Sequence, residues 1–295
     1  MTATRPTELV RADLYFCWWW TWAFVPLTLA HLLGRPSLVT GVFDEWMFDE
    51  RPLIQRILLR FALRFADRNI FISELERRIV PERFAVNNPG YSPCIVDTAR
   101  YRPAPLVQRE GFLLTVAWLA AENASRKGIL ELIRALPLIL ARHPNVRWVH
   151  CGEHGTGAQA VHAEIEACGV GHAVEFRGVV TADEKIALMQ SCGAYVQPSR
   201  FEGFGLAVLE AMACGAPVAT SRGGALPEVV GDAGMLFDDL APETIASAVS
   251  RLLADPISAA ALGARARQRA EREFSFARRR ADLEQAIAGA LATTR

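Results

Sequence analysis

Residues 194–220, with the sequence AYVQPSRFEGFGLAVLEAMACGAPVAT, decide the fold. An apolar run at 194–197 is followed by a polar loop with two glycines, a helical stretch at 205–214 that ends at Gly215, and a second apolar run at 217–220. Strands that are apolar on both faces and are separated by a helix are typical of a parallel sheet covered by helices on both sides. The stretch therefore predicts one strand–helix–strand unit of an α/β domain.

The same alternation continues on both sides of this stretch. We expect further strands at 112–118, 146–151, 173–176 and 235–237, and helices at 128–142, 158–168 and 182–191. Residues 241–293 read as helices with breaks at 255–256 and 274–276. This pattern predicts a doubly wound parallel sheet, whose ligands bind at the carboxyl ends of the strands.

The first hundred residues form a different block. Strands are expected at 13–19, 37–42 and 69–73, with a helical stretch at 52–66. The polar, proline-bearing segment 100–105 is the predicted linker. We therefore predict a short N-terminal α/β domain at 1–104 and a larger domain at 105–295.

Residues 14–33 allow two interpretations. They carry no Asp, Glu, Lys or Arg, so their length would suffice for a membrane span. The alternative is a buried strand followed by a buried helix that stops at Gly34. Pro26 near the helix start and a tryptophan cluster in mid-span favour this alternative, because tryptophan in membrane helices prefers the interfaces.

The composition excludes several classes of protein. The chain has 295 residues, of which 51% are hydrophobic and 22% charged, and its formal net charge is +0. These values exclude intrinsic disorder and argue against nucleic-acid binding, which needs a basic excess. Six cysteines without a CxxC pair argue against a zinc site or a disulfide framework, and without a recognisable secretory signal we expect a cytoplasmic protein.

Arginine is the dominant basic residue. Only Lys127 and Lys185 are lysines among the 32 basic residues, so the place of each lysine is informative. Seven arginines lie between residues 265 and 280. This basic helical face could rest on anionic lipid at the inner face of a membrane, or it could be a solvated face with local ion pairs.

The loop before residue 206 has the features of a phosphate site. A helix that starts near Gly205 presents unpaired amides and a partial positive charge, and Gly203 and Gly205 allow a close backbone approach. Glu210, one turn into the helix, can reach back to a diol such as ribose, and Glu202 lies on the loop itself. The arrangement indicates a nucleotide-sugar site, although two glutamates eight residues apart also occur by chance.

Glu202 and Glu210 stand at the two positions of a Glu-x7-Glu motif, and the stretch resembles the retaining GT-B glycosyltransferases called group 1 or family 4. Lys127-Gly128 resembles the Lys-Gly of the family's donor domain. Residues 221–230 (SRGGALPEVV) resemble its Gly-Gly…Pro-Glu loop, and residues 234–237 (GMLF) resemble the Gly-Leu-Leu-Val segment that follows this loop. The motifs follow in the family's order over residues 111–280. The resemblance implies a GT-B-like fold with a donor-binding C-terminal domain and a shortened N-terminal domain.

The resemblance also implies roles. Lys127 would hold the donor diphosphate, Glu202 would contact the transferred sugar, and Glu210 would bind the ribose. The amides of Gly203, Phe204, Gly205 and Leu206 would hold the pyrophosphate, and Gly223 and Gly224 would line the cleft. The co-substrate would be a UDP- or GDP-sugar, without a metal or other cofactor. The acceptor would be a glycan, a lipid-linked molecule or a small molecule, and the product would retain the anomeric configuration.

Two departures from the family pattern leave three accounts open. Trp118 stands where family members carry a phosphate-binding arginine, which Arg126 could replace. The N-terminal block lacks the glycine-rich loop and the histidine of the family, and Asp44 is the polar residue near the histidine's place. The chain could be a compact active transferase, a part of a longer or two-chain enzyme, or an inactive nucleotide-binding relative.

A dinucleotide-dependent oxidoreductase is the third functional class that the sequence suggests. Gly152, Gly155 and Gly157 follow a predicted strand. Their order does not match GxGxxG, in which each glycine has its own geometric role. We therefore rank this class below a transferase and a nucleotide-binding module.

Overall fold

The computed structural model describes residues 12–41, 48–104 and 109–293. The chain divides into two compact units, one made of the residues up to Cys94 and from Phe276 onward, the other of Ile95–Ser275. This division differs from the predicted boundary at 104/105. Arg267 donates hydrogen bonds to the carbonyls of Thr98 and Tyr101 at 2.9 and 2.6 Å, which ties the predicted linker to the second unit.

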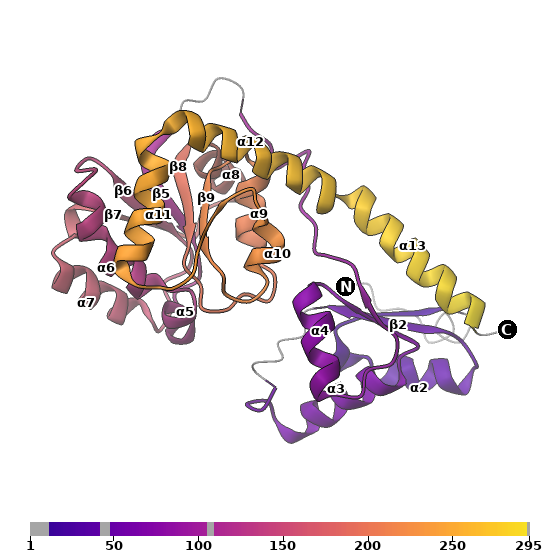
Figure 1. Ribbon diagram of the computed structural model, residues 1–295. Coiled ribbons are helices and arrows are strands. Elements are labelled where there is room, and N and C mark those ends of the chain that lie inside the picture. Colours follow the sequence, from indigo (N-terminus) through magenta and orange to yellow (C-terminus); the bar gives the residue numbers. More distant parts are fainter. Residues whose placement is uncertain (1–11, 42–47, 105–108, 294–295) are drawn as a thin grey trace. The chain divides into compact units, whose positions relative to one another are not determined.

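The second unit contains a six-stranded, all-parallel sheet (Figure 1). The strand order is β10-β9-β8-β5-β6-β7, and every neighbouring pair is parallel. The predicted doubly wound fold is confirmed. The strands are β5 (Glu110–Val116), β6 (Arg147–Cys151), β7 (Val174–Gly178), β8 (Cys192–Gln197), β9 (Val218–Ser221) and β10 (Met235–Phe237).

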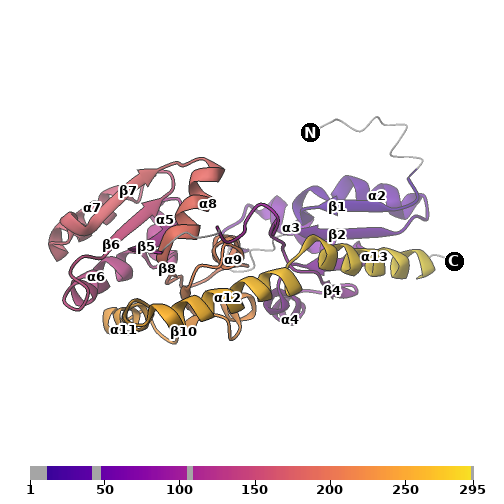
Figure 2. The same ribbon diagram turned by 90° about the horizontal axis from the view of Figure 1, so that it is seen from above.

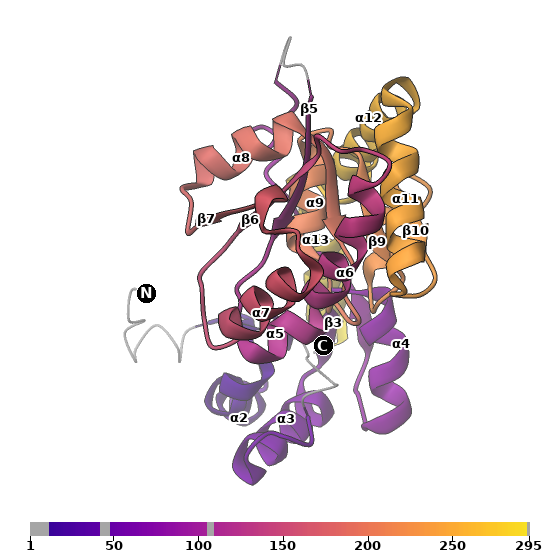
Figure 3. The ribbon, with the colours of Figure 1, turned by 90° about the vertical axis from the view of Figure 1, so that its left-hand side faces the viewer.

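Helices cover both faces of this sheet, and Figure 3 shows α8 and α11 on opposite sides of it. A core of buried aliphatic side chains from α6 and α11, together with Trp148 of β6, fills one side. The helices are α5 (Ala121–Arg126), α6 (Ile129–Leu140), α7 (Ala158–Cys168), α8 (Ala182–Ser191), α9 (Leu206–Ala213), α10 (Leu226–Val230), α11 (Pro242–Ala254) and α12 (Pro256–Glu273), with a 3₁₀ turn, η3, at Gly171–Ala173.

The strand order reverses between β5 and β8. From β5 the chain proceeds outward to β6 and β7, and it then returns to β8, on the other side of β5, and continues to β9 and β10. Ligands of open α/β sheets bind at such a reversal, beyond the carboxyl ends of the strands. In this chain those ends are Val116 of β5 and Gln197 of β8.

Three loops pack tightly together beyond these strand ends, and glycines make the contact possible. Gly128 has a φ of +64°, and a Cβ there would lie 1.9 Å from the carbonyl oxygen of Pro198. A Cβ on Gly223 would lie 2.2 Å from the carbonyl oxygen of Ser199. The loops that carry Lys127 and Gly223 therefore both lie against the backbone of the loop that carries Glu202.

The first unit is a four-stranded parallel sheet with the order β1-β2-β3-β4. Alternate strand residues face two cores: Val39 and Phe71 pack with α2, α3 and α4, whereas Leu38 and Ile70 pack against Ala286 of α13. Figure 2 shows α2 and α13 on opposite faces of β1 and β2. The elements are β1 (Tyr15–Trp18), a 3₁₀ turn η1 (Trp20–Trp22), α2 (Phe24–Leu32), β2 (Ser37–Gly41), α3 (Leu53–Phe65), β3 (Arg68–Phe71), α4 (Glu74–Arg83), β4 (Pro89–Tyr91) and α13 (Phe276–Thr293).

Residues 14–33 form a strand, a 3₁₀ turn and a nine-residue helix, as the second interpretation predicted. The expectation that they are buried is wrong for most of them, since six of the twenty residues are buried and nine are exposed. Trp20 is buried and donates a hydrogen bond to Asn69, but Trp18, Trp19 and Trp22 are exposed. Among the described residues, no single helix has the length and apolar composition to cross a membrane, and one pair, bent by 101° between α11 and α12–α13, meets these criteria only in combination.

We predict that Gly128→Ala is far more destabilising than Gly169→Ala. Both glycines have left-handed φ values, +64° and +67°, which cost a side chain about 1–2 kcal/mol. Only at Gly128 does the new Cβ also collide with another loop, whereas nothing lies within 4 Å of it at Gly169. Urea unfolding of the two variants measures the difference, and equal losses of stability would contradict the tight packing of the loops.

We predict a loss of stability in acid that arises from His150. This residue is fully buried beside Trp148 and Phe176. Burial, and secondly the charge of His154, lowers the pKa of His150 from 6.5 to about 4. The pKa of His150 is lower in the folded state than in the unfolded state, so protonation favours unfolding. The free energy of unfolding should therefore fall by roughly 3 kcal/mol as the pH is lowered from above 6.5 to below 4.

His150→Phe keeps a ring of similar size and should remove this part of the acid sensitivity. The free energy of unfolding in urea, measured at neutral pH and near the folded pKa, tests it. The exposed His172, changed in the same way, is the control. An unchanged pH dependence in His150→Phe would refute the assignment.

Candidate active site

Glu202 is the centre of a buried polar cluster between β8 and α9. Its side chain is only 7% exposed. One carboxylate oxygen, Oε1, accepts hydrogen bonds from Lys127 Nζ at 2.6 Å, Ser199 Oγ at 2.7 Å and Gln197 Nε2 at 3.1 Å. The orientation of the carboxylate is therefore fixed by its own loop and strand, and its charge is balanced by Lys127 from the neighbouring loop.

Arg126 brings a second cation to the same carboxylate. Its Nη1 lies 3.7 Å from Glu202 Oε2 and donates to the Phe201 carbonyl at 3.0 Å, while Nη2 donates to Asn123 Oδ1 at 2.7 Å. The sequence left open whether Arg126 points to the site, and the structure places it there. Trp118, at the position of the family's arginine, is half exposed.

The charge of Lys127 is held in a partly desolvated place. Burial lowers the pKa of Lys127, and the charge and hydrogen bond of Glu202 oppose this shift. A charge in such a place acts more strongly on a neighbouring anion than it would in water. Lys127 is therefore suited to the stabilisation of a phosphate group.

The loop amides after Glu202 lead directly into a helix start. Gly205, with a φ of +99°, precedes α9, and no side chain caps this start, so the first amides of the helix have no partner within the helix. Phe204 is buried and packs edge-on against Phe274 with ring centroids 5.7 Å apart, which fixes the loop. Leu206 is half exposed. The amide-lined start of a helix is suited to an anion.

Glu210 forms a second lysine–glutamate pair. Lys185 Nζ, from α8, lies 2.8 and 2.7 Å from its two carboxylate oxygens and 5.3 Å from the centre of the Tyr101 ring. Burial lowers the pKa of Lys185, but the hydrogen bond and charge of Glu210, with Tyr101, outweigh it, and the pKa is raised. Sequence reasoning missed Lys185 as a site residue, although the scarcity of lysine was a signal.

Gly223 and Gly224 pack against the backbone of the loop that carries Glu202. A Cβ on Gly224, whose φ is +64°, would lie 2.2 Å from the Glu202 carbonyl oxygen. The next residue, Ala225, donates its amide to that same carbonyl at 2.9 Å. Both glycines thus lie beside the predicted site, where they allow the close packing of its loops.

Asp44, the polar candidate near the place of the family's histidine, lies outside the described residues. Within the described residues, no group of three or more His, Cys, Asp or Glu side chains is arranged to hold a metal ion.

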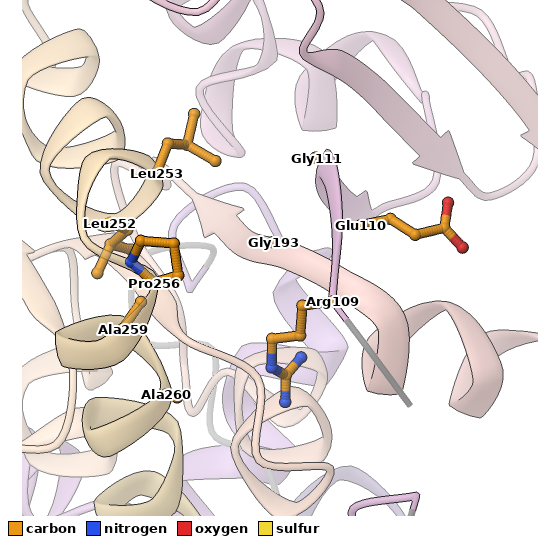
Figure 4. A pocket seen from close by; sticks show the side chains of 9 residues that line it. All are labelled: Arg109, Glu110, Gly111, Gly193, Leu252, Leu253, Pro256, Ala259 and Ala260. Carbon is orange, nitrogen blue, oxygen red and sulfur yellow. The ribbon is translucent and has the colours of Figure 1, made fainter. Parts of the chain in front are cut away.

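A hollow of about 430 Å³ lies at the opposite edge of the sheet, where β5 and β8 begin (Figure 4). Its wall is mainly apolar, from Leu252, Leu253 and Pro256. Arg109 is engaged with the backbone there, donating to the Cys192 carbonyl at 3.0 Å and to that of Gly215, and the Glu110 carboxylate points away from the apolar residues. The groups suited to chemistry therefore lie at the carboxyl edge of the sheet.

Comparison with known proteins identifies the family of this chain. Residues 109–269 match the family model described as "Glycosyl transferases group 1". A GDP-mannose-dependent alpha-(1-6)-phosphatidylinositol monomannoside mannosyltransferase of Mycolicibacterium smegmatis is 31% identical over 92% of this chain and 76% of its own length. A protein of the same description from Mycobacterium tuberculosis is 30% identical over 84% of this chain and 70% of its own length.

Solved structures share the fold. A sucrose-phosphate synthase from Thermosynechococcus elongatus superposes with a TM-score of 0.79 at 21% identity, over 96% of this chain and 75% of its own. A HepE protein of Anabaena, solved with UDP and glucose, superposes with a TM-score of 0.78 at 21% identity, over 96% of this chain and 79% of its own. The matched family model, the relatives that are at least 30% identical and the GT-B fold lead to the same conclusion. This chain belongs to the group 1 glycosyl transferases.

Proposed function

We propose that the chain transfers a sugar, with retention of the anomeric configuration, from a GDP-sugar to a lipid-linked glycan acceptor, and that mannose is the first sugar to test. The observation that carries the proposal is the buried cluster of Glu202, Lys127 and Arg126 beside the uncapped start of α9. The proposed donor and acceptor are those of the GDP-mannose-dependent phosphatidylinositol monomannoside mannosyltransferases that are at least 30% identical to this chain.

The charge balance of the site suits a diphosphate. Two cations, Arg126 and Lys127, lie at one carboxylate, Glu202, so this cluster keeps a net positive charge. A nucleoside diphosphate sugar brings two negative charges, which Lys127, Arg126 and the amides of α9 would share. These groups would also stabilise the further charge that develops on the leaving diphosphate.

The two carboxylates would have different partners in the bound state. Glu202 accepts its three hydrogen bonds within the protein at Oε1. Oε2 is therefore the atom that can accept a hydrogen bond from a hydroxyl of the transferred sugar. Both carboxylate oxygens of Glu210 accept hydrogen bonds from Lys185 Nζ. Glu210 would bind a ribose diol either together with Lys185 or in its place. A carboxylate with two oxygens matches two neighbouring hydroxyls.

Retention and independence of a metal are parts of the proposal that follow from the family resemblance. Arg126 and Lys127, together with the amides at the start of α9, can neutralise the diphosphate, a role that divalent ions fill in other phosphate-binding sites. The inactive nucleotide-binding relative is the competing account, and turnover separates the two.

We expect Lys127→Met to lower turnover with GDP-mannose by about a hundredfold to a thousandfold, the usual cost of removing one group that stabilises developing charge. Glu202→Gln keeps the shape of the side chain but removes its charge, and it should also reduce turnover strongly. Radiolabelled mannose transfer to a lipid extract measures both. The exposed Glu243, changed to Gln, is the matched control.

The same assay tests the finer claims. Proton NMR of the first product should show an anomeric centre with the configuration of the donor, and EDTA should leave the rate unchanged. GDP binding without any turnover over a broad set of donors and lipid acceptors would favour the binding module. Full activity in both Lys127→Met and Glu202→Gln would refute the site.

A further inference from the structure

The solvent side of helix α3 carries exposed apolar side chains beside its arginines. Leu59, Ala62 and Leu63 are buried in the unit, whereas Leu53, Ile54 and Ile57 are 67, 62 and 51% exposed. An amphipathic helix of a globular protein normally turns its apolar residues toward the core and its polar residues toward solvent. The outer side of α3 therefore lacks a partner that the described residues supply.

The apolar surface continues from α3 onto α2. The rings of Phe24 in α2 and Phe61 in α3 lie 5.0 Å apart, and Phe61 and Phe65 lie 4.7 Å apart. Val25 and Leu32 of α2 are exposed, and Trp22, just before α2, is 80% exposed. We call these exposed side chains of α2 and α3, with Trp22, the α2–α3 face. Apolar patches of this extent mark interaction sites.

The charges of these two helices have a single sign. Neither α2 nor α3 contains Asp or Glu, and α3 carries Arg56, Arg60 and Arg64, spaced four residues apart and so on one flank. Arg56 lies 3.8 Å from Asp49. Within the described part of the chain, Arg60 and Arg64 have aromatic rings as neighbours and no carboxylate within 4.0 Å. The flank therefore keeps a net positive charge.

The arginines that the sequence suggested for lipid contact are largely committed elsewhere. Arg267 and Arg269 donate to backbone carbonyls of their own unit, and Arg279 is buried, donating to the Ser92 carbonyl at 2.8 Å. Arg278 and Arg280 form ion pairs with Asp282 and Glu284. Most arginines of the run 265–280 are thus paired within the chain, whereas Arg60 and Arg64 of α3 have no carboxylate partner among the described residues.

We infer that the α2–α3 face docks on an anionic lipid bilayer. Apolar side chains beside arginines are the composition of helices that lie in the plane of a membrane surface, and tryptophan prefers the same interface. Trp22, Ile54 and Ile57 would enter the boundary between headgroups and acyl chains, with Arg60 and Arg64 at the phosphates. This docking deepens the proposed function, because a lipid-linked acceptor lies in such a surface.

Sedimentation with vesicles tests the docking without any nucleotide or acceptor, so its result is independent of the transferase activity. The full chain should bind vesicles of equal parts phosphatidylcholine and phosphatidylglycerol and should bind pure phosphatidylcholine at least about tenfold more weakly, since each basic residue near an anionic surface adds to the attraction. Added salt should weaken the binding.

Matched variants locate the contact. Ile54→Gln with Ile57→Gln, and separately Arg64→Gln, should each weaken binding by about three- to tenfold or more. The controls carry the same changes on α12, at the exposed Ile257 and at Arg265, and should bind as the natural chain does. Unchanged circular dichroism and thermal unfolding show that the variants fold.

Three results would overturn the inference. The natural chain could fail to bind vesicles of either composition. The α3 variants could bind as tightly as the controls. Light scattering could show a dimer of the natural chain that the Ile54→Gln, Ile57→Gln variant abolishes without any vesicle binding in either protein, in which case the face covers a second copy of this chain.

Discussion

The ion pair between Lys127 and Glu202 is the interaction on which the site depends. The two residues come from loops 75 positions apart, and they meet at 2.6 Å because Gly128 lets its loop lie directly on Pro198. Breaking a buried ion pair by removing one partner is costly, since the other charge remains desolvated. The charge balance of the site therefore depends on the close packing of the loops. The Lys-Gly and Glu-x7-Glu motifs of the family contain the residues that both require.

Lysine side chains neutralise both motif glutamates. Each of the chain's two lysines is paired with one of them, Lys127 with Glu202 and Lys185 with Glu210. Such pairing keeps desolvated cations in place before a donor arrives. In the proposed function, a diphosphate would compete with the Glu202 carboxylate for Lys127, which would favour ligands with a strong and compact negative charge. The α2–α3 face would bring this chemistry to an acceptor held in lipid.

Much of the second unit, Ile95–Ser275, could be predicted from the local sequence. The rest depends on contacts between residues that are far apart in the sequence. Apolar runs and glycine positions were enough to predict every strand of the six-stranded sheet, and Glu202 and Lys127 were found through motifs. The pairing of Lys185 with Glu210 was missed, because nothing local to residue 185 indicates it. The return of α13 to the first unit was also missed, since it rests on contacts of Arg279 with Ser92 and of Ala286 with Leu38, which are far apart in the sequence. The exposure of Trp18 and Trp22 was missed because hydrophobicity alone does not distinguish a core from a docking surface.

The scarcity of lysine allows the central claim to be measured directly. Protein labelled with ¹⁵N-lysine contains only two side-chain amines, and Lys127→Arg assigns them. If Lys127 exchanges Glu202 for the diphosphate, its Nζ signal should shift on addition of GDP, with a saturation that follows GDP binding measured by calorimetry. A Lys127 signal that stays in place while GDP binds would contradict the account, because the nucleotide would then be held somewhere other than at the Lys127–Glu202 pair.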